Sequence, residues 1–161
     1  MPGMSAPLRI APVTVARPAV RELIALHLAG MHANSPPGQV SALDLSAYEK
    51  PGLTLWGAWR GDALAGMVAL QRLGARTGEI KSMRTHPDHL RQGVASALLD
   101  HLIGAARGEG LARLSLETGS GAAFEPALAL YRKRGFVNGA AFGGYAASDF
   151  NQFLHLALAP S

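Results

Sequence analysis

The chain has 161 residues, a formal net charge of +4 and no cysteine, and 48% of its residues are apolar. This length and apolar content are typical of a single domain with one core, which we expect to span residues 1–161. The lack of cysteine excludes disulfides, thiolate metal sites and a cysteine nucleophile. Basic residues are scattered, apart from the run 132–134 (Arg-Lys-Arg). This scatter argues against nucleic acid as a partner.

The hydrophobic pattern indicates neither export nor membrane insertion. The N-terminal stretch is not followed by the continuous apolar segment of a signal peptide. No apolar run reaches the roughly 18 residues that a membrane span needs. We therefore expect a cytoplasmic protein with no membrane partner.

The N-terminal part of the chain is predicted to contain one strand and two helices. Leu8 to Val15 has the pattern of a strand, and Pro18 then begins a helix whose apolar residues recur at helical spacing up to Met31. The segment 34–38 (Asn-Ser-Pro-Pro-Gly) ends that helix. A short second helix is expected around Leu43 to Glu49.

Three strands are predicted next. Residues 53–59 and 63–72 are apolar runs separated by the tight turn 60–62 (Arg-Gly-Asp), which indicates a hairpin. A third strand, over 79–85, ends before Pro87 because proline cannot continue a hydrogen-bonded ladder.

The C-terminal half alternates helices and strands. Helices are predicted at 94–107 and 126–134, and strands at 113–117, 136–142 and 152–158. The first helix has the clearest apolar face and ends at Gly108 and Gly110. The order of the elements indicates a mixed α/β domain built around one sheet.

The segment from Arg91 to Ser96 (Arg-Gln-Gly-Val-Ala-Ser) lies between a predicted strand and a long helix. A helix start presents free N–H groups and partial positive charge, and a glycine lets a phosphate approach the backbone. This junction suits an anion, although an ordinary loop with a flexible glycine has the same local spacing. No P-loop is present, and the Gly119-Ser120-Gly121 run lacks the further glycine and acidic residue of a dinucleotide loop.

Two segments resemble motifs of one enzyme family. The stretch 83–99, with Met-Arg-Thr-His-Pro-Asp at its start and Gly-Val-Ala-Ser-Ala-Leu-Leu at its end, resembles motif A of the GNAT superfamily of N-acetyltransferases. The stretch 130–136 (Leu-Tyr-Arg-Lys-Arg-Gly-Phe) resembles motif B. Segments 35–37, 42–45 and 117–119 further resemble one group of bacterial GNAT proteins of uncertain substrate.

The resemblance covers nearly the whole chain and implies the GNAT fold, a mixed, twisted sheet of seven strands flanked by about four helices. It implies an enzyme that transfers acetyl from acetyl-CoA directly to the amine of a small molecule or peptide. A non-catalytic acyl-CoA-binding regulatory module on the same fold is the alternative. Related proteins are often dimers, so a homodimer is compatible with the resemblance.

The resemblance also implies where acetyl-CoA binds. The backbone of Met83, Arg84 and Thr85 would pair with the pantetheine arm. The pyrophosphate would lie on the N–H groups of a run of six residues: Arg91, Gln92, Gly93, Val94, Ala95 and Ser96. The thioester would lie where the strands 79–85 and 113–117 splay apart. Leu90 departs from motif A, which usually has Arg or Gln there, and Arg91 or Gln92 could compensate.

Two residues are candidates for proton transfer. Glu79 begins a strand at the position where many GNAT enzymes place a general base, and its alternative role is an ion pair with Arg76 or Lys81. Tyr131 matches the motif B tyrosine that protonates the departing thiolate, and its alternative role is core packing.

The remaining polar residues carry weaker signals. His32 and Ser35 lie in the expected substrate loop. Glu117 is either an acid in the cleft or a strand-end carboxylate, and Tyr145 is expected to pack. We expect no metal, because the histidines are dispersed: His27 and His32, for example, do not have the spacing of a helical metal-binding pair.

Overall fold

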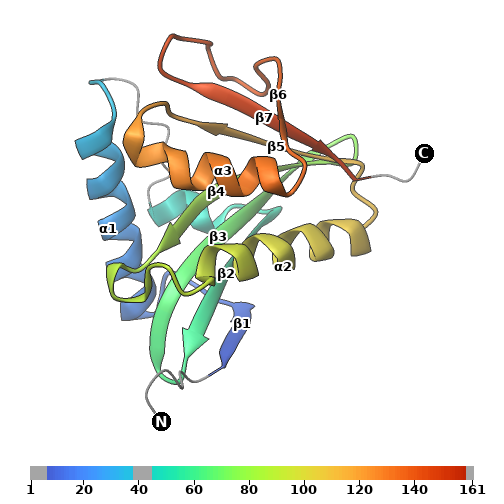
Figure 1. Cartoon of the computed structure of the whole chain (residues 1–161). Helices are drawn as coiled ribbons and strands as arrows, with labels where there is room; N and C mark the ends of the chain where they lie inside the picture. The colour runs from blue at the N-terminus through green and yellow to red at the C-terminus, as the bar shows by residue number, and fades with distance from the viewer. Residues whose placement is uncertain (1–6, 38–44, 159–161) are drawn as a thin grey trace.

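The computed structural model describes residues 7–37 and 45–158. Its centre is a seven-stranded sheet with the strand order β1-β2-β3-β4-β5-β7-β6 (Figure 1). The strands are β1 (Leu8–Pro12), β2 (Leu53–Arg60), β3 (Ala63–Gly74), β4 (Thr77–Thr85), β5 (Arg113–Thr118), β6 (Val137–Asn138) and β7 (Gln152–Ala157). Every neighbouring pair is antiparallel except β4 and β5, which run parallel.

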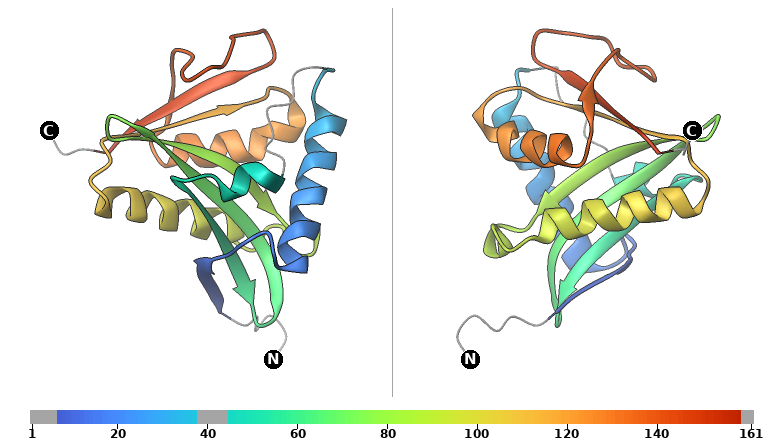
Figure 2. Two further views of the ribbon diagram at one scale, coloured as in Figure 1. Left: turned by 180° about the vertical axis from the view of Figure 1, so that it is seen from behind. Right: turned by 45° about the vertical axis from the view of Figure 1, so that its right-hand side comes forward.

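The helices form two layers on the sheet. Those of the described residues are α1 (Pro18–Asn34), η1 (Leu45–Glu49), η2 (Pro87–His89), α2 (Val94–Gly108), η3 (Ala122–Phe124) and α3 (Glu125–Lys133), where η marks a short 3-10 helix. Helices α2 and α3 cover one face, and α1 with η1 covers the other (Figure 2). Among the described residues, no helix is long and apolar enough to cross a membrane.

Each long helix buries the face that its apolar spacing predicts. In α2, Leu98, Leu102 and Ala106 are fully buried in the larger core cluster with β3 and β5. In α1, Val20 and Ile24 are buried in a second cluster with β2 and β3. The sheet therefore separates two cores, which gives the site on β4 two differently lined sides.

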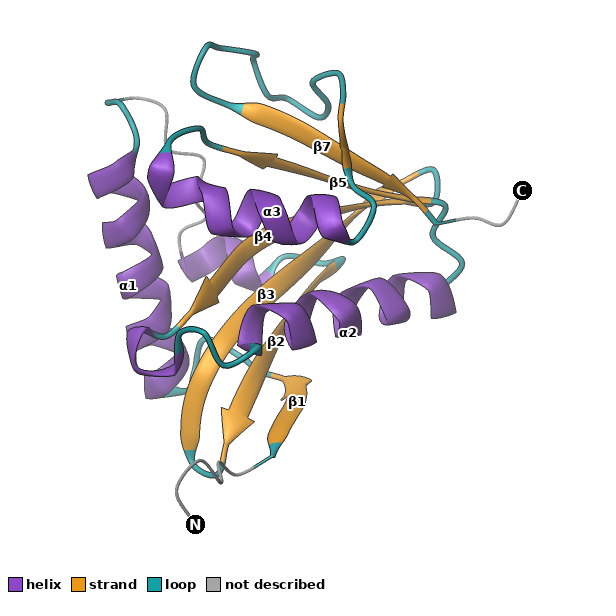
Figure 3. Ribbon diagram, viewed as in Figure 1, coloured by secondary structure: helices purple, strands orange, loops and turns teal. Residues whose placement is uncertain are grey.

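The predicted fold class is confirmed, and some elements differ in detail. The strand expected over 136–142 is limited to β6, which ends directly before Gly139. The helix expected over 43–49 is a 3-10 helix from Leu45 to Glu49, and residues 43 and 44 lie outside the described part of the chain. Three α-helices are present in the described residues, against about four expected (Figure 3).

Candidate active site

Strands β4 and β5 pair over a short distance only. Their parallel register covers Thr77 with Arg113, Gly78 with Leu114 and Glu79 with Ser115, and ends there. Beyond this point the strands diverge, and a cavity of about 620 Å³ opens between them. It is lined by residues of α1, β4, the start of α2, β5 and α3. The cavity therefore passes through the sheet between two of its interior strands and meets both helix layers.

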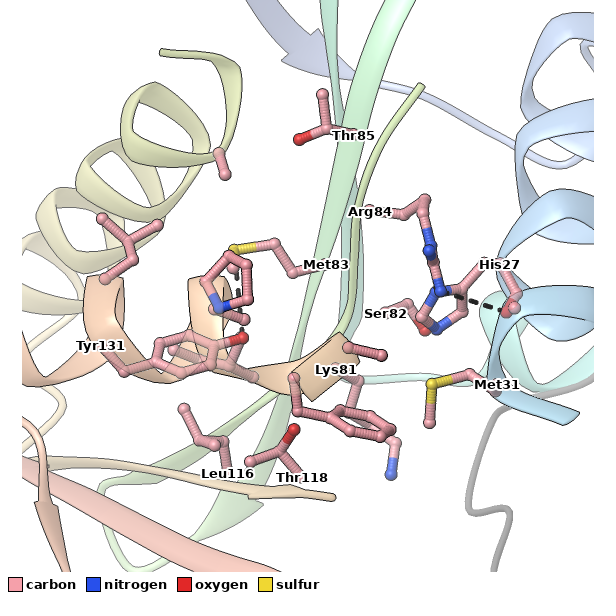
Figure 4. A pocket seen from close by; sticks show the side chains of 18 of the residues that line it. His27, Met31, Lys81, Ser82, Met83, Arg84, Thr85, Leu116, Thr118 and Tyr131 are labelled. Carbon is pink, nitrogen blue, oxygen red and sulfur yellow. Dashed lines mark hydrogen bonds between the residues drawn. The ribbon is translucent and has the colours of Figure 1, made fainter. Parts of the chain in front are cut away.

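A bulge in β4 decides which side chain enters which half of the cavity. The pairing with β3 shifts between Met67–Arg84 and Ala69–Lys81, and Ser82 has φ +57°. The extra residue reverses the alternation of side chains along the strand. Met83 consequently points toward α3, whereas Arg84 points toward α1 (Figure 4).

Tyr131 projects from α3 into the cavity. Tyr131 is 6% exposed, and within the described part of the chain its hydroxyl makes one hydrogen bond, a long contact of 4.0 Å to the sulfur of Met83. Burial raises the pKa of this phenol above its ordinary value, so the hydroxyl stays protonated. A thioether sulfur is a weak acceptor, so this donor remains available for a stronger one in the cavity.

Glu79 lies where the pairing of β4 and β5 ends, and it belongs to a polar cluster. Its Oε2 accepts hydrogen bonds from the Tyr145 hydroxyl at 2.5 Å and from Lys81 Nζ at 3.1 Å. Lys81 Nζ also donates to the Tyr145 hydroxyl at 2.7 Å. Glu79 is 6% exposed, yet it lines the cavity. Of the two ion pairs considered, the structure forms the one with Lys81, since Arg76 donates to the Gly110 carbonyl.

Tyr145 packs as expected and also makes a polar contact that was not expected. Its ring does contact Phe142 and Phe153, but its hydroxyl reaches Glu79 in the cavity. Burial and the hydrogen bond to Glu79 raise the pKa of Tyr145, which keeps the hydroxyl a donor. Glu117, on β5, lines the same part of the cavity and accepts a hydrogen bond from Asn151 Nδ2 at 3.2 Å.

One face of α1 forms the opposite wall. Its lining residues follow the helical spacing i, i+3, i+4 and i+7: His27, Gly30, Met31 and Asn34. His32 is exposed on another side of the helix, and Ser35 follows the helix end; neither lines the cavity. A role of these two residues in acceptor binding stays a prediction.

His27 and Arg84 connect this wall to β4. Arg84 Nε donates to His27 Nδ1 at 3.0 Å, and Arg84 Nη2 to the His27 carbonyl at 3.3 Å. Burial, and then the charge of Arg84, lower the pKa of His27 to about 4. His27 is therefore neutral near pH 7, with the Nδ1 lone pair directed at the guanidinium.

The start of α2 borders the cavity on the other side of the sheet. Arg91 and Gly93 both have left-handed backbones, with φ +61° and +79°. The first N–H with an acceptor inside the helix is that of Ala97, which binds the Gly93 carbonyl, and no side chain caps the helix. The N–H groups of residues 94–96 have no acceptor within the helix. A Cβ built on Gly93 would meet no atom within 4 Å, so the approach is open.

Most of the predicted cofactor residues line one cavity. They are Met83, Arg84, Thr85, Arg91, Gly93, Val94, Ala95 and Ser96, together with Leu90 at an exposed position. Gln92 does not line it, and its carbonyl accepts a hydrogen bond from Arg60 at 3.3 Å. Among the described residues, no group of three metal-ligating side chains occurs.

Sequence reasoning missed four contributions to this cavity: Lys81, Tyr145, His27 and the side chain of Arg84. The α1 residues carry a usable signal, because the polar His27 and Asn34 share a helical face with Gly30 and Met31. Tyr145 carries none, since it reaches Glu79 from an irregular loop between β6 and β7.

Comparisons with known proteins agree with this geometry. Residues 21–136 match the model of the acetyltransferase (GNAT) family. The chain is 45% identical over 141 residues to the uncharacterized N-acetyltransferase YedL of Escherichia coli (strain K12), which covers 88% of this chain and 89% of that protein. It is 47% identical over 135 residues to the uncharacterized N-acetyltransferase YsnE of Bacillus subtilis (strain 168), covering 84% and 89%.

The fold also matches solved structures. A GNAT family acetyltransferase from Elizabethkingia anophelis, crystallised with acetyl-CoA bound, superimposes with a TM-score of 0.69 at 20% identity, covering 94% of this chain and 98% of that one. The chain therefore belongs to the GNAT acetyltransferase family and is an acyl-CoA-dependent N-acyltransferase.

Proposed function

We propose that the donor is acetyl-CoA and that the acetyl group passes directly to an amine inside the cavity between β4 and β5. The observation that carries this proposal is the end of strand pairing at Glu79 and Ser115. It opens a passage with Tyr131 and the start of α2 on one side of the sheet and Glu79 on the other. Donor and acceptor can thus enter from opposite faces and meet at the opening.

The start of α2 fits the pyrophosphate of such a donor. The N–H groups of Val94, Ala95 and Ser96 and the helix dipole favour an anion there. The left-handed Gly93 leaves that approach clear of side-chain atoms. Because these donors belong to the backbone, Leu90 in place of Arg or Gln removes one side-chain contact and leaves the site usable.

The free edge of β4 fits the pantetheine arm. Arg84 and Thr85 pair with β3 on one side, but β5 does not pair with this part of β4 on the other. Backbone groups on that edge need partners when water is displaced, and the amide groups of pantetheine could supply them. Acetyl-CoA, once bound, contributes an acyl thioester whose carbonyl carbon can accept an amine.

The proton steps are assigned to two residues of this chain. Glu79 accepts a proton from the attacking amine, directly or through a water molecule, as the new C–N bond forms. Tyr131 donates its phenolic proton to the sulfur as the thioester C–S bond breaks. Burial raises the pKa of Tyr131, so its proton is present when the donor binds, and the same burial disfavours a free thiolate and so increases the proton affinity of the leaving sulfur.

The test is a thiol-release assay with acetyl-CoA across amino acids, polyamines, aminoglycosides and peptide N-termini, with each product identified by mass spectrometry. We expect at least one class to gain a single acetyl group on nitrogen. Tight acetyl-CoA binding with no transfer to any amine would instead support a regulatory binding module.

A further inference from the structure

Arg84 brings a positive charge into the α1 side of the cavity without a negative partner. Within residues 7–37 and 45–158, its guanidinium forms no ion pair with Asp or Glu. Its hydrogen bonds go to the ring nitrogen and the carbonyl of His27, both neutral, and Nη1 donates to no acceptor among these residues. A half-buried cation is costly unless an anion accompanies it, and burial accordingly lowers the pKa of Arg84.

The guanidinium is held in place. His27 Nδ1 fixes Nε, and this contact requires an unprotonated ring nitrogen, which the low pKa of His27 provides. Gly30 supplies the space, because a Cβ at that position would lie 2.9 Å from Arg84 Nη2. A fixed guanidinium can bind a carboxylate with little further ordering.

Negative groups lie elsewhere in the same cavity. Glu79 and Glu117 stand on neighbouring strands, and Lys81 pairs with Glu79. The cavity lining thus includes carboxylates on β4 and β5. The guanidinium of Arg84, which has no acidic partner among the described residues, lies beside α1 (Figure 4). The arrangement matches a ligand that carries both an amine and an anionic group.

We propose that the acceptor is an amine that also carries a carboxylate, as a free amino acid does, and that this carboxylate binds Arg84. This inference rests on the proposed acetyl transfer and specifies its substrate class. A polyamine or an aminoglycoside carries only positive charge and would leave Arg84 unpaired. A peptide N-terminus places its own carboxylate far from the reacting amine.

The experiment compares free amino acids with their carboxamides as acceptors. The amides keep the shape and remove the charge, and their more weakly basic amines are favoured by the chemistry alone. We expect kcat/KM to be about 10-fold to 100-fold higher for the acids, the usual strength of a charge-assisted pair. Arg84→Gln should remove this preference, Arg84→Lys should keep part of it, and the exposed Arg107→Gln should retain it fully.

Acetyl-CoA titrations on each variant separate the outcomes. Equal use of acids and amides by the unaltered protein would overturn the proposal, as would an acid preference that survives in Arg84→Gln. Loss of acetyl-CoA affinity in Arg84→Gln, with the acid preference intact, would reassign Arg84 to the donor. If neither the acids nor the amides are acetylated, the transfer proposal fails for this class of acceptor. The melting temperature of the CoA-loaded protein then still tests Arg84: the acid should raise it and the amide should not if Arg84 binds carboxylates.

Discussion

The Tyr145 hydroxyl donates a hydrogen bond to Oε2 of Glu79 at 2.5 Å, which joins the loop between β6 and β7 to the point where β4 and β5 separate. Lys81 bonds both partners and completes a closed polar cluster. Two donors, Tyr145 and Lys81, thus hold the carboxylate through the same oxygen, Oε2. We propose that Glu79 is the proton acceptor and that Tyr145 positions it.

The first prediction separates these two roles. Glu79→Gln keeps the shape and removes the base, so kcat at neutral pH should fall about 100-fold or more. Tyr145→Phe keeps the carboxylate and removes one hydrogen bond that orients it, so the loss of kcat should be smaller. Steady-state kinetics of both variants across about pH 5 to 9 provide the check. An unchanged profile in Glu79→Gln would assign the base role to water or to the acceptor.

Tyr131 gives the second prediction. Tyr131→Phe removes a hydroxyl whose one hydrogen bond among the described residues is the long contact to Met83, so stability should change by less than about 1 kcal/mol. If the hydroxyl protonates the leaving thiolate, kcat should fall about 10-fold to 1,000-fold with acetyl-CoA affinity nearly constant. Kinetics beside a binding titration distinguish this from a packing role, for which full activity would remain. Weaker binding with normal kcat would make the hydroxyl a donor contact.

The third prediction concerns pH and His27. Its pKa is about 4 in the folded protein against an ordinary 6.5, so the unfolded chain binds more protons between these values. The contribution of neutral His27 to the free energy of unfolding is therefore complete above about pH 6.5. As the pH falls toward 4, the free energy of unfolding decreases by up to about 3 kcal/mol. Chemical denaturation from pH 7 to pH 4 measures this loss, and His27→Gln should flatten the slope. An equal slope in that variant would place the acid sensitivity in other groups.

Much of the fold could be predicted from the sequence, because the ends of helices and the turns depend on the conformational preferences of single residues. Pro18 begins α1, Gly61 makes the hairpin turn with φ +57°, and the glycines after α2 end that helix. The motifs at 83–99 and 130–136 identified the family before any contact was known. These features are set by backbone conformations that only certain residues favour.

The acceptor side could not be predicted from the same rules. Regular alternation would place Glu79, Lys81 and Met83 on one face of β4, but the bulge at Ser82 turns Met83 toward Tyr131 and Arg84 toward His27. A serine in a left-handed conformation has no sequence signature, since tertiary packing imposes it. The meeting of Tyr145 with Glu79 likewise depends on a loop fixed only in the folded chain.

The central claim, that the start of α2 and the opening between β4 and β5 form the acetyl-CoA site, is tested most directly by calorimetric titration of acetyl-CoA. Gly93→Glu adds negative charge and bulk where the pyrophosphate should lie, whereas Gly110→Glu is a matched control at the other end of α2. Both glycines have left-handed backbones, φ +79° and +81°, with open space at the Cβ position, so both variants should lose similar stability.

We expect saturable binding to the unaltered protein and to Gly110→Glu, and affinity at least about 10-fold weaker in Gly93→Glu. Equal affinity in all three proteins would contradict the account.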